Sequence, residues 1–423
     1  MAKISREISS SFMSTISREA IVGLGQIALT PLFIFRFGQD DYTKWLTVLA
    51  YTSFIVLADF GLSTVIVSKL IFILEHFNTF DFSLWKWFKR KTLFLAAFMA
   101  IAIAFFCAQK FPFRIHQDDY FNSNLQLYIA LTLSSFITLS QHFWLYRVQI
   151  EGRAALGQRS LTVVRSVEIV TLAILLQVHL SISNFAWIFV LLKFLTYLCL
   201  RLSRKEFLEP ARVFDSVPDT TGLLFPAMSN GFITSANIIS LHGSFIVASF
   251  WLDAPALIAI VIARMLASPI RILGTAITAA MLPFLIRASQ SKSFESESHR
   301  VLKNLPRLSI LGLIFSTGCL LTASNSLWNL LSHNLIQFNG ILVLWFIIAT
   351  LSDSILAIKF QRLISSNKAF VGGTLYLIVT IILTISQQYV GNLLGVIAVP
   401  ICIIIADIII IMYIYITGWL NAN

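Results

Sequence analysis

Long apolar stretches separated by short polar ones run through the whole chain of 423 residues. A stretch of about 18 or more mainly apolar residues is long enough to cross a bilayer as a helix. The pattern predicts twelve spans, at 10–34, 45–67, 92–109, 125–146, 161–178, 184–200, 223–249, 256–285, 307–323, 335–357, 370–386 and 393–416. The sequence therefore predicts an all-α polytopic membrane protein.

The spacing of these spans repeats halfway along the chain. A shift of 212 residues places the first six spans on the last six, and the longest polar break, 201–222, falls between them. Six spans per half, with both ends on one side, indicate parallel repeats related by an axis along the membrane normal. We therefore predict two pseudo-symmetric six-helix lobes, 1–205 and 223–423, joined by a cytoplasmic linker at 206–222.

Charge is scarce and unevenly placed. Only 12% of residues are charged, against about 25% in soluble proteins. With the N-terminus in the cytoplasm, the predicted cytoplasmic segments hold 22 Lys and Arg, and the outer loops hold 4. This bias predicts that both termini are cytoplasmic. The net charge of +11 is then mainly a topology signal, and we expect no nucleic-acid partner.

Two arginines lie inside the eighth predicted span. Arg264 and Arg271 are seven residues apart, which places them on one helix face about 10 Å from each other. Each would cost about 2.5–3.5 kcal/mol at a helix centre facing lipid, so we expect both to face protein or water. One hypothesis is a cationic wall that binds phosphate or another anion. The alternative is neutralisation by buried acids such as Asp59 or Asp353.

The repeat suggests further members of such a site. It aligns Arg271 with Asp59 in the second span, and Arg18 with Asn230 in the seventh. We take Arg18 and Asn230 as additional cargo-binding candidates and Asp59 as a charge partner of Arg271, while a partner in the interface region is the alternative for Arg18. Neighbouring residues of a helix point about 100° apart, so Arg18 and Glu19 cannot share a helix face.

Other charged residues inside predicted spans are candidates for ion coupling. Arg165 and Glu168 lie at i and i+3 and can pair, and an inner-interface salt bridge is the favoured interpretation. Lys193 and Asp407 fall near the middles of the sixth and twelfth spans, where either could belong to a proton or sodium relay. For Asp353, near the inner end of the tenth span, the alternative is that its side chain simply extends toward the cytoplasm.

Signatures of enzymes and metal sites are absent from the sequence. The seven histidines are scattered without paired metal spacing, and the four cysteines lie at unrelated positions inside apolar runs. The longest predicted outer loop, 110–124, is too short to house a catalytic domain. We therefore expect a carrier with no cofactor and no metal, and with H⁺ or Na⁺ as the candidate coupling ion.

One region resembles a known family of membrane carriers. The stretch RFGQDDYTKWLTVLAYTSFIVLADFGLSTVIVSKL at 36–70 places Gly38, Tyr42 and Trp45 before a D-x-G-L motif at 59–62. This arrangement resembles the loop and second helix of Wzx-type flippases for O-antigen and other polysaccharides. That family belongs to the multidrug, oligosaccharidyl-lipid and polysaccharide exporter superfamily.

The resemblance implies a substrate and a mechanism. It implies that an undecaprenyl-pyrophosphate-linked oligosaccharide, an O-antigen or capsule repeat unit, crosses from the cytoplasmic to the periplasmic leaflet of the bacterial inner membrane. It also implies a MATE-like V-shaped central cavity with alternating access, in which Arg264, Arg271 and Arg18 hold the anionic head. A monomer is expected, with a polysaccharide polymerase and chain-length machinery as further partners.

Two alternatives are weighed against this reading. A multidrug or cation antiporter of the same superfamily should have an acidic and aromatic cavity, and the arginines of the eighth span argue against it. A membrane-embedded polysaccharide polymerase or ligase should carry a sizeable outer loop, which the predicted topology lacks.

Overall fold

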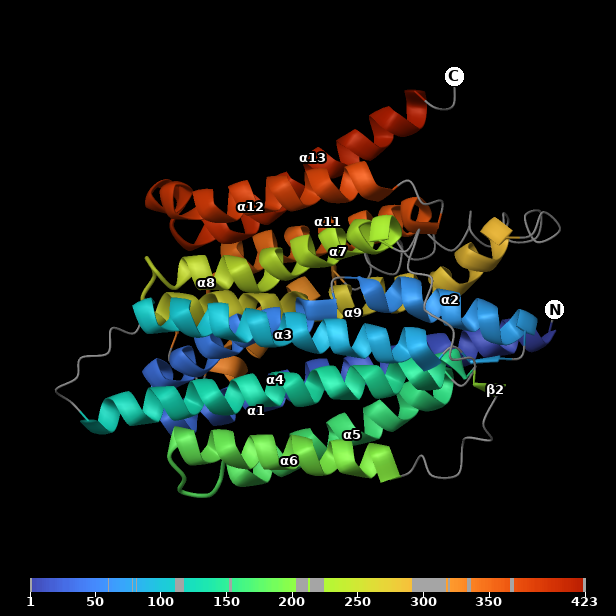
Figure 1. Cartoon of the computed structure of the whole chain (residues 1–423). Helices are drawn as coiled ribbons and strands as arrows, with labels where there is room; N and C mark the ends of the chain where they lie inside the picture. The colour runs from blue at the N-terminus through green and yellow to red at the C-terminus, as the bar shows by residue number, and fades with distance from the viewer. Residues whose placement is uncertain are drawn as a thin grey trace. The chain divides into compact units, whose positions relative to one another are not determined.

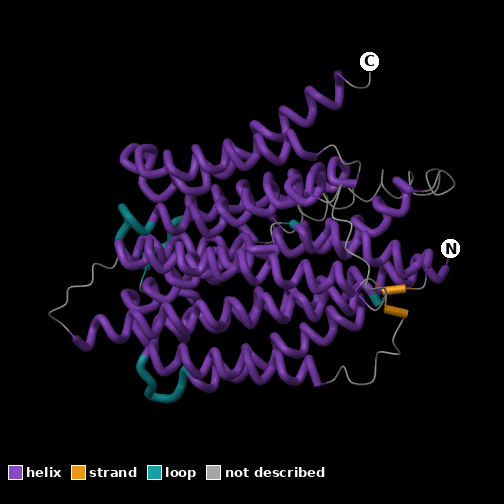
Figure 2. Tube along the Cα trace, viewed as in Figure 1, coloured by secondary structure: helices purple, strands orange, loops and turns teal. Residues whose placement is uncertain are grey.

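The computed structural model is helical almost throughout the part of the chain that it describes (Figure 2). It describes residues 2–59, 61–77, 79–80, 82–110, 118–151, 154–202, 212–213, 224–290, 317–318, 320–332, 336–365 and 369–420. Within these ranges the only strands are β1 (Thr79–Phe80) and β2 (Arg212–Val213), which pair in parallel. The predicted all-α class is confirmed. The ninth predicted span and the linker at 206–222 lie mostly outside the described residues.

Six of the described segments are long and apolar enough to cross a membrane, which makes the protein a multi-pass membrane protein. They are Ile16–Asp59, Ile182–Leu202, Ala227–Ala248, Ala254–Thr275, Gly340–Phe360 and Ala369–Thr417. The first and last contain 44 and 49 residues. Because about 20 residues suffice for one crossing, each of these two is long enough for two.

Backbone breaks divide the two longest segments. Helix α1 (Ala2–Ser53) is interrupted at Gly38, whose φ of 80° and ψ of 173° are not helical. Helices α12 (Ala369–Leu394) and α13 (Ala398–Leu420) are separated by the 3₁₀ turn η3 (Gly395–Ile397). The break at Gly38 lies between the first two predicted spans, whereas the turn Gly395–Ile397 lies just inside the predicted twelfth span, 393–416.

The chain forms two compact units. The N unit is Arg36–Ile238, and the C unit combines Met1–Phe35 with Ile239–Asn423. The first part of α1 therefore groups with the C-terminal half, and α7 (Leu224–Ile238) groups with the N-terminal half. The division into six-helix lobes at 1–205 and 223–423 stays a prediction.

In the N unit, α4 is the central packing element. Helix α4 (Asp118–Ile150) contacts α5 (Ala154–Leu175), α6 (Ile182–Leu202) and α2 (Leu62–Phe77) (Figure 1). Helix α3 (Phe82–Lys110) packs against α4 and against the 3₁₀ helix η1 (Phe54–Asp59). These contacts bring α4, α5 and α6 together around one polar interior, described below.

The basic segment before the third span differs from its prediction. Its pattern predicts an amphipathic element at 77–91 lying on the inner leaflet. In the structure, 82–91 instead form the first turns of α3, with Trp85 and Phe88 buried. Both rings pack edge-on against Phe143 of α4, at centroid distances of 6.3 and 5.4 Å. Aromatic packing against α4 therefore holds this segment to the body of the N unit.

In the C unit, α9 and α11 form the most extensive helix pair. Helix α9 (Ala254–Gln290) packs along α11 (Gly340–Ser365), and α13 covers α11 and α12. In the part of α1 that precedes the break at Gly38, Thr30 donates a hydrogen bond to the sulfur of Met265 on α9, at 3.4 Å. These contacts place α9, which carries both intramembrane arginines, among α1, α11 and their neighbours.

The D-x-G-L motif has a structural explanation within the N unit. The carboxylate of Asp59 accepts hydrogen bonds from the backbone N–H of Gly61 at 3.2 Å and from the hydroxyl of Ser63 at 2.6 Å, at the start of α2. Gly61 has a φ of 70°. A Cβ there would lie 2.4 Å from the backbone nitrogen of Gly231 and 2.8 Å from the carbonyl oxygen of Ala227. The motif therefore caps α2 and permits close contact with α7.

We expect Gly61→Ala to destabilise the protein more than a matched glycine substitution. Gly395 also has a positive φ, 57°, but nothing lies within 4 Å of its Cβ position. Gly395→Ala should thus cost only the left-handed conformation, about 1–2 kcal/mol. Gly61→Ala adds a clash with rigid backbone, so its heat-unfolding midpoint in detergent should fall at least about twice as far. Equal decreases would contradict this account of the motif.

Candidate functional site

Charged side chains gather at two places inside the membrane-spanning helices. The N-unit network is formed by two residues from each of α4, α5 and α6: Thr138, Gln141, Arg165, Glu168, Lys193 and Thr196. The C-unit cluster contains Arg264 and Arg271 from α9 together with the acids Asp353 and Asp407 from α11 and α13.

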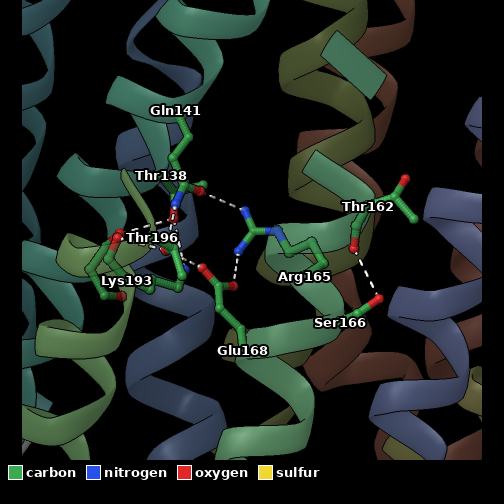
Figure 3. A network of polar contacts seen from close by, with 9 residues as sticks. Thr138, Gln141, Thr162, Arg165, Ser166, Glu168, Lys193 and Thr196 are labelled. Carbon is green, nitrogen blue, oxygen red and sulfur yellow. Dashed lines mark hydrogen bonds and ion pairs between the residues drawn. The ribbon is translucent and has the colours of Figure 1, made fainter. Parts of the chain in front are cut away.

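Glu168 is the only carboxylate of the N-unit network (Figure 3). The predicted ion pair with Arg165 is present, and Glu168 is 3% exposed. Its second oxygen accepts a hydrogen bond from the hydroxyl of Thr196 at 3.0 Å. The Arg165 guanidinium also donates to the side-chain oxygen of Gln141 at 3.0 Å. The pair is thus an internal element joining three helices, and its place at the inner membrane interface stays a prediction.

Lys193 adds a second cation to this network. Its ammonium group donates to the hydroxyl of Thr138 at 2.8 Å and lies 4.8 Å from the centre of the Phe189 ring. Both Arg165 and Glu168 act on it electrostatically. The network therefore contains two cationic side chains and one carboxylate, and loss of one proton from Lys193 would make it neutral. Such a centre can serve ion coupling, as the position of Lys193 predicts.

In the C unit, Arg264 is anchored to the backbone of a π-helix. Its guanidinium donates to the carbonyl oxygen of Leu241 at 2.7 Å. Leu241 belongs to η2 (Ile239–Gly243), a π-helical turn between α7 and α8 (Ser244–Ala248). Such turns interrupt the regular helical hydrogen-bond ladder and are frequent at functional sites. His242 of the same turn lies within electrostatic reach of Arg264 and Arg271, a contact that sequence reasoning did not find.

The two acids of the C-unit cluster are linked to Arg271 through successive electrostatic interactions. Arg271 acts electrostatically on Asp353, and Asp353 acts on Asp407. Asp407 is fully buried and accepts hydrogen bonds from Ser352 at 2.6 Å and from the Tyr376 hydroxyl at 3.3 Å. Asp353 therefore belongs to the cluster, which disfavours simple extension toward the cytoplasm. It also supports partial neutralisation of Arg271 by an acid.

A buried polar stripe on α12 approaches this acid pair. Its side chains are Tyr376, Thr380, Thr384 and Gln387, spaced by four, four and three residues and therefore on one helix face. The amide nitrogen of Gln387 donates to Ser244 of α8 at 3.0 Å. Among the described residues, the amide oxygen of Gln387 and the hydroxyl of Thr380 are buried without a partner. Such groups are sites for bound water. The helical spacing of these polar residues within the apolar span could have predicted this stripe, but sequence reasoning missed it.

Arg18 and Glu19 form an ion pair between adjacent positions. The nitrogen Nε of Arg18 donates to the carboxylate of Glu19 at 3.0 Å. The two residues do not share a helix face, but the long arginine side chain reaches across the 100° between them. Arg18 belongs to the C unit with Arg264 and Arg271, whereas Asn230 belongs to the N unit and is buried. Cargo contacts by Arg18 and Asn230 stay predictions.

Asp59 is held within the N unit. Besides Gly61 and Ser63, the hydroxyl of Tyr146 donates to its carboxylate at 3.3 Å. Asp59 and Arg271 belong to different units, so their pairing stays a prediction.

The chain was compared with known proteins and structures. No protein-family model and no curated protein matches it. Solved structures do match over nearly the whole length. The MATE multidrug transporter DinF-BH in complex with R6G is 13% identical, covers 97% of this chain and 95% of its own, and has a TM-score of 0.67. A MATE protein in complex with MaD5 is also 13% identical, with 99% and 96% covered and a TM-score of 0.63.

A third match is described as having a binding pocket of reverse polarity that suggests a different function. This is a MOP superfamily transporter from Pyrococcus furiosus, 12% identical, with 99% and 96% covered and a TM-score of 0.61. At such identities the likeness shows the fold. The chain therefore has a MATE-like fold, as the fold prediction expected.

We expect Glu168→Gln to destabilise the protein strongly. The substitution removes a buried carboxylate from the buried Lys193 and the half-buried Arg165, and breaking a buried pair costs about 3–5 kcal/mol. A matched control is Asp41→Asn, which breaks another i,i+3 pair, Asp41 with Lys44 at 2.7 Å, whose side chains are 39% and 25% exposed. Such a surface pair contributes about 0–1 kcal/mol. Heat-unfolding midpoints in detergent compare the two variants.

Adding Lys193→Met to Glu168→Gln should recover part of the lost stability, because it removes one of the two cations. If Glu168→Gln lowers the midpoint no more than Asp41→Asn, the carboxylate does not hold the network together.

Proposed function

We propose that the protein is a transporter that moves an undecaprenyl-pyrophosphate-linked oligosaccharide from the cytoplasmic to the periplasmic leaflet of the bacterial inner membrane. The cargo class is an O-antigen or capsule repeat unit, as for Wzx-type flippases. Movement is by alternating access, with both termini in the cytoplasm. The observation that carries the proposal is the presence of Arg264 and Arg271 on a membrane-spanning helix of a transporter fold.

The arginines suit a pyrophosphate head. A guanidinium has five N–H donors in a planar fork that matches phosphate oxygens. Arg264 uses one nitrogen for the carbonyl oxygen of Leu241, which fixes the group while leaving further donors for an anion. Among the described residues, Arg271 also interacts electrostatically with Asp353. A bound anion would add negative charge beside both guanidinium groups.

Polarity separates this proposal from multidrug export. The MATE protein in complex with R6G is described as a multidrug transporter, and the Pyrococcus furiosus transporter is described by a pocket of reverse polarity and a different function. Arginines within α9 favour the second kind of relationship, with an anionic cargo. The predicted topology lacks the sizeable outer loop that is expected of a polymerase or ligase.

Ion coupling completes the proposed cycle. The carboxylates Asp353 and Asp407 and the Lys193 ammonium are buried groups that can exchange a proton, and H⁺ is the ion that suits both kinds of group. Asp59 is the proposed partner of Arg271 when the cargo has left. This exchange of partners would let the empty carrier return without an unpaired charge in the membrane.

The test is binding of undecaprenyl pyrophosphate to the purified full chain in nanodiscs. Each charge-assisted hydrogen bond contributes about 1.5–3 kcal/mol, so Arg264→Gln with Arg271→Gln should weaken binding by about 100-fold or more. The control double variant, Arg159→Gln with Lys359→Gln, removes the same charge from exposed positions and should change affinity by less than about twofold.

The dye R6G serves as the competing probe. Unchanged affinity of the α9 double variant for undecaprenyl pyrophosphate would overturn the proposed site. Tight binding of R6G together with no binding of undecaprenyl pyrophosphate by the unmodified chain would overturn the function and favour multidrug export.

A further inference from the structure

A group of cations lies at one end of the N unit. Lys89 comes from the first turns of α3, and Arg147 and Arg201 come from the last turns of α4 and α6. Both arginines act electrostatically on Lys89. The Lys89 ammonium also lies 5.9 Å from the centre of the Phe143 ring. Three helices that pack together thus bring three cations to one place.

Within the described part of the chain, one acid is seen to pair with this group. Arg147 pairs with Glu151 at 3.3 Å, which offsets one of the three cations. Partial burial, together with the charges of Arg147 and Arg201, lowers the pKa of Lys89 below its ordinary value. Burial likewise lowers the pKa of Arg147, against the opposing effect of Glu151. An added anion would therefore be attracted to this group.

Helix dipoles explain only part of the arrangement. Cations in the last turn of a helix are stabilised by the negative end of its dipole, which accounts for Arg147 and Arg201. This effect fades within one turn of the helix end, and Lys89 lies about two turns into α3. Helix dipoles therefore do not account for the position of Lys89 beside the two arginines.

The surface next to these cations has the shape of a phospholipid contact. Along α3, Lys86, Arg90, Phe94, Phe98 and Ile101 are all exposed. Their spacing of four, four, four and three residues places them on one face of the helix. The face begins with two cations and continues with three apolar side chains that are 65–72% exposed. A free phosphate would contact only the cations, whereas an anionic lipid would also contact the apolar side chains that follow them on α3.

We propose that the start of α3, with the ends of α4 and α6, binds the headgroup phosphate of an anionic phospholipid. Lys89, Arg147 and Arg201 contact the phosphate, and the acyl chain lies along the apolar face of α3. The predicted span at 92–109 begins just beyond Lys89, which places the site at the predicted cytoplasmic interface, where anionic headgroups lie. This site belongs to the N unit and does not depend on the proposed cargo site on α9.

The proposal is tested by native mass spectrometry of the full chain in detergent, with phosphatidylglycerol and phosphatidylcholine as probes. Lys89→Gln with Arg201→Gln should weaken phosphatidylglycerol binding about 30-fold and leave phosphatidylcholine binding unchanged. The control, Arg159→Gln with Lys359→Gln, removes two exposed cations elsewhere and should change either affinity less than about twofold. Lys89→Arg with Arg201→Lys keeps the charge and should retain binding, which separates loss of charge from misfolding.

Three results would overturn the proposal. If both glutamine double variants lose phosphatidylglycerol equally, the attraction is general to the basic surface. If inorganic phosphate at millimolar concentration displaces phosphatidylglycerol from the unmodified chain, the site is one for a free anion. If the chain binds phosphatidylglycerol and phosphatidylcholine equally, the cations do not select a lipid.

Discussion

A charged side chain inside a bilayer must find its partner within the protein, because hydrocarbon offers neither water nor counter-ions. The interior of both units follows from this constraint. In the N unit, Glu168 links Arg165 to Thr196, and Lys193 is held by Thr138. In the C unit, Arg264 donates a hydrogen bond to a carbonyl oxygen of a π-helical turn, and Arg271 has Asp353 within electrostatic reach. The helices that supply these groups are therefore fixed by their polar contacts as well as by apolar packing.

The two polar centres differ in a way that suits a carrier. The N-unit network is compact and highly hydrogen-bonded, and its hydroxyl and amide groups hold the charges in place. The C-unit cluster is extended, with arginines on α9, acids on α11 and α13, and buried groups without a partner on α12. An extended cluster whose members act at a distance can change partners, and transport of a charged cargo requires such an exchange. The C unit is thus the better candidate for cargo binding.

Sequence patterns predicted the elements and the local pairs, because both depend on spacing along the chain. Apolar run length gave the membrane class, and the i,i+3 spacing gave the Arg165–Glu168 pair. Contacts between helices could not be predicted from spacing, because they join residues that are far apart in the sequence. The hydrogen bonds Lys193–Thr138 and Ser352–Asp407 each join residues 55 positions apart. Two local contacts were also not predicted: side-chain flexibility joins Arg18 to Glu19, and aromatic packing holds the start of α3 against α4.

The most direct test of the central claim is cargo translocation in a host strain that lacks this protein, complemented with Arg271→Ala or with the unmodified chain at equal protein levels. Surface glycan and lipid-linked oligosaccharide on the cytoplasmic face are measured together. The account predicts that Arg271→Ala accumulates the lipid-linked oligosaccharide inside and displays little surface glycan, because the anionic head loses a guanidinium in the membrane interior. Normal surface glycan from Arg271→Ala would contradict the claim that this arginine takes part in moving the cargo.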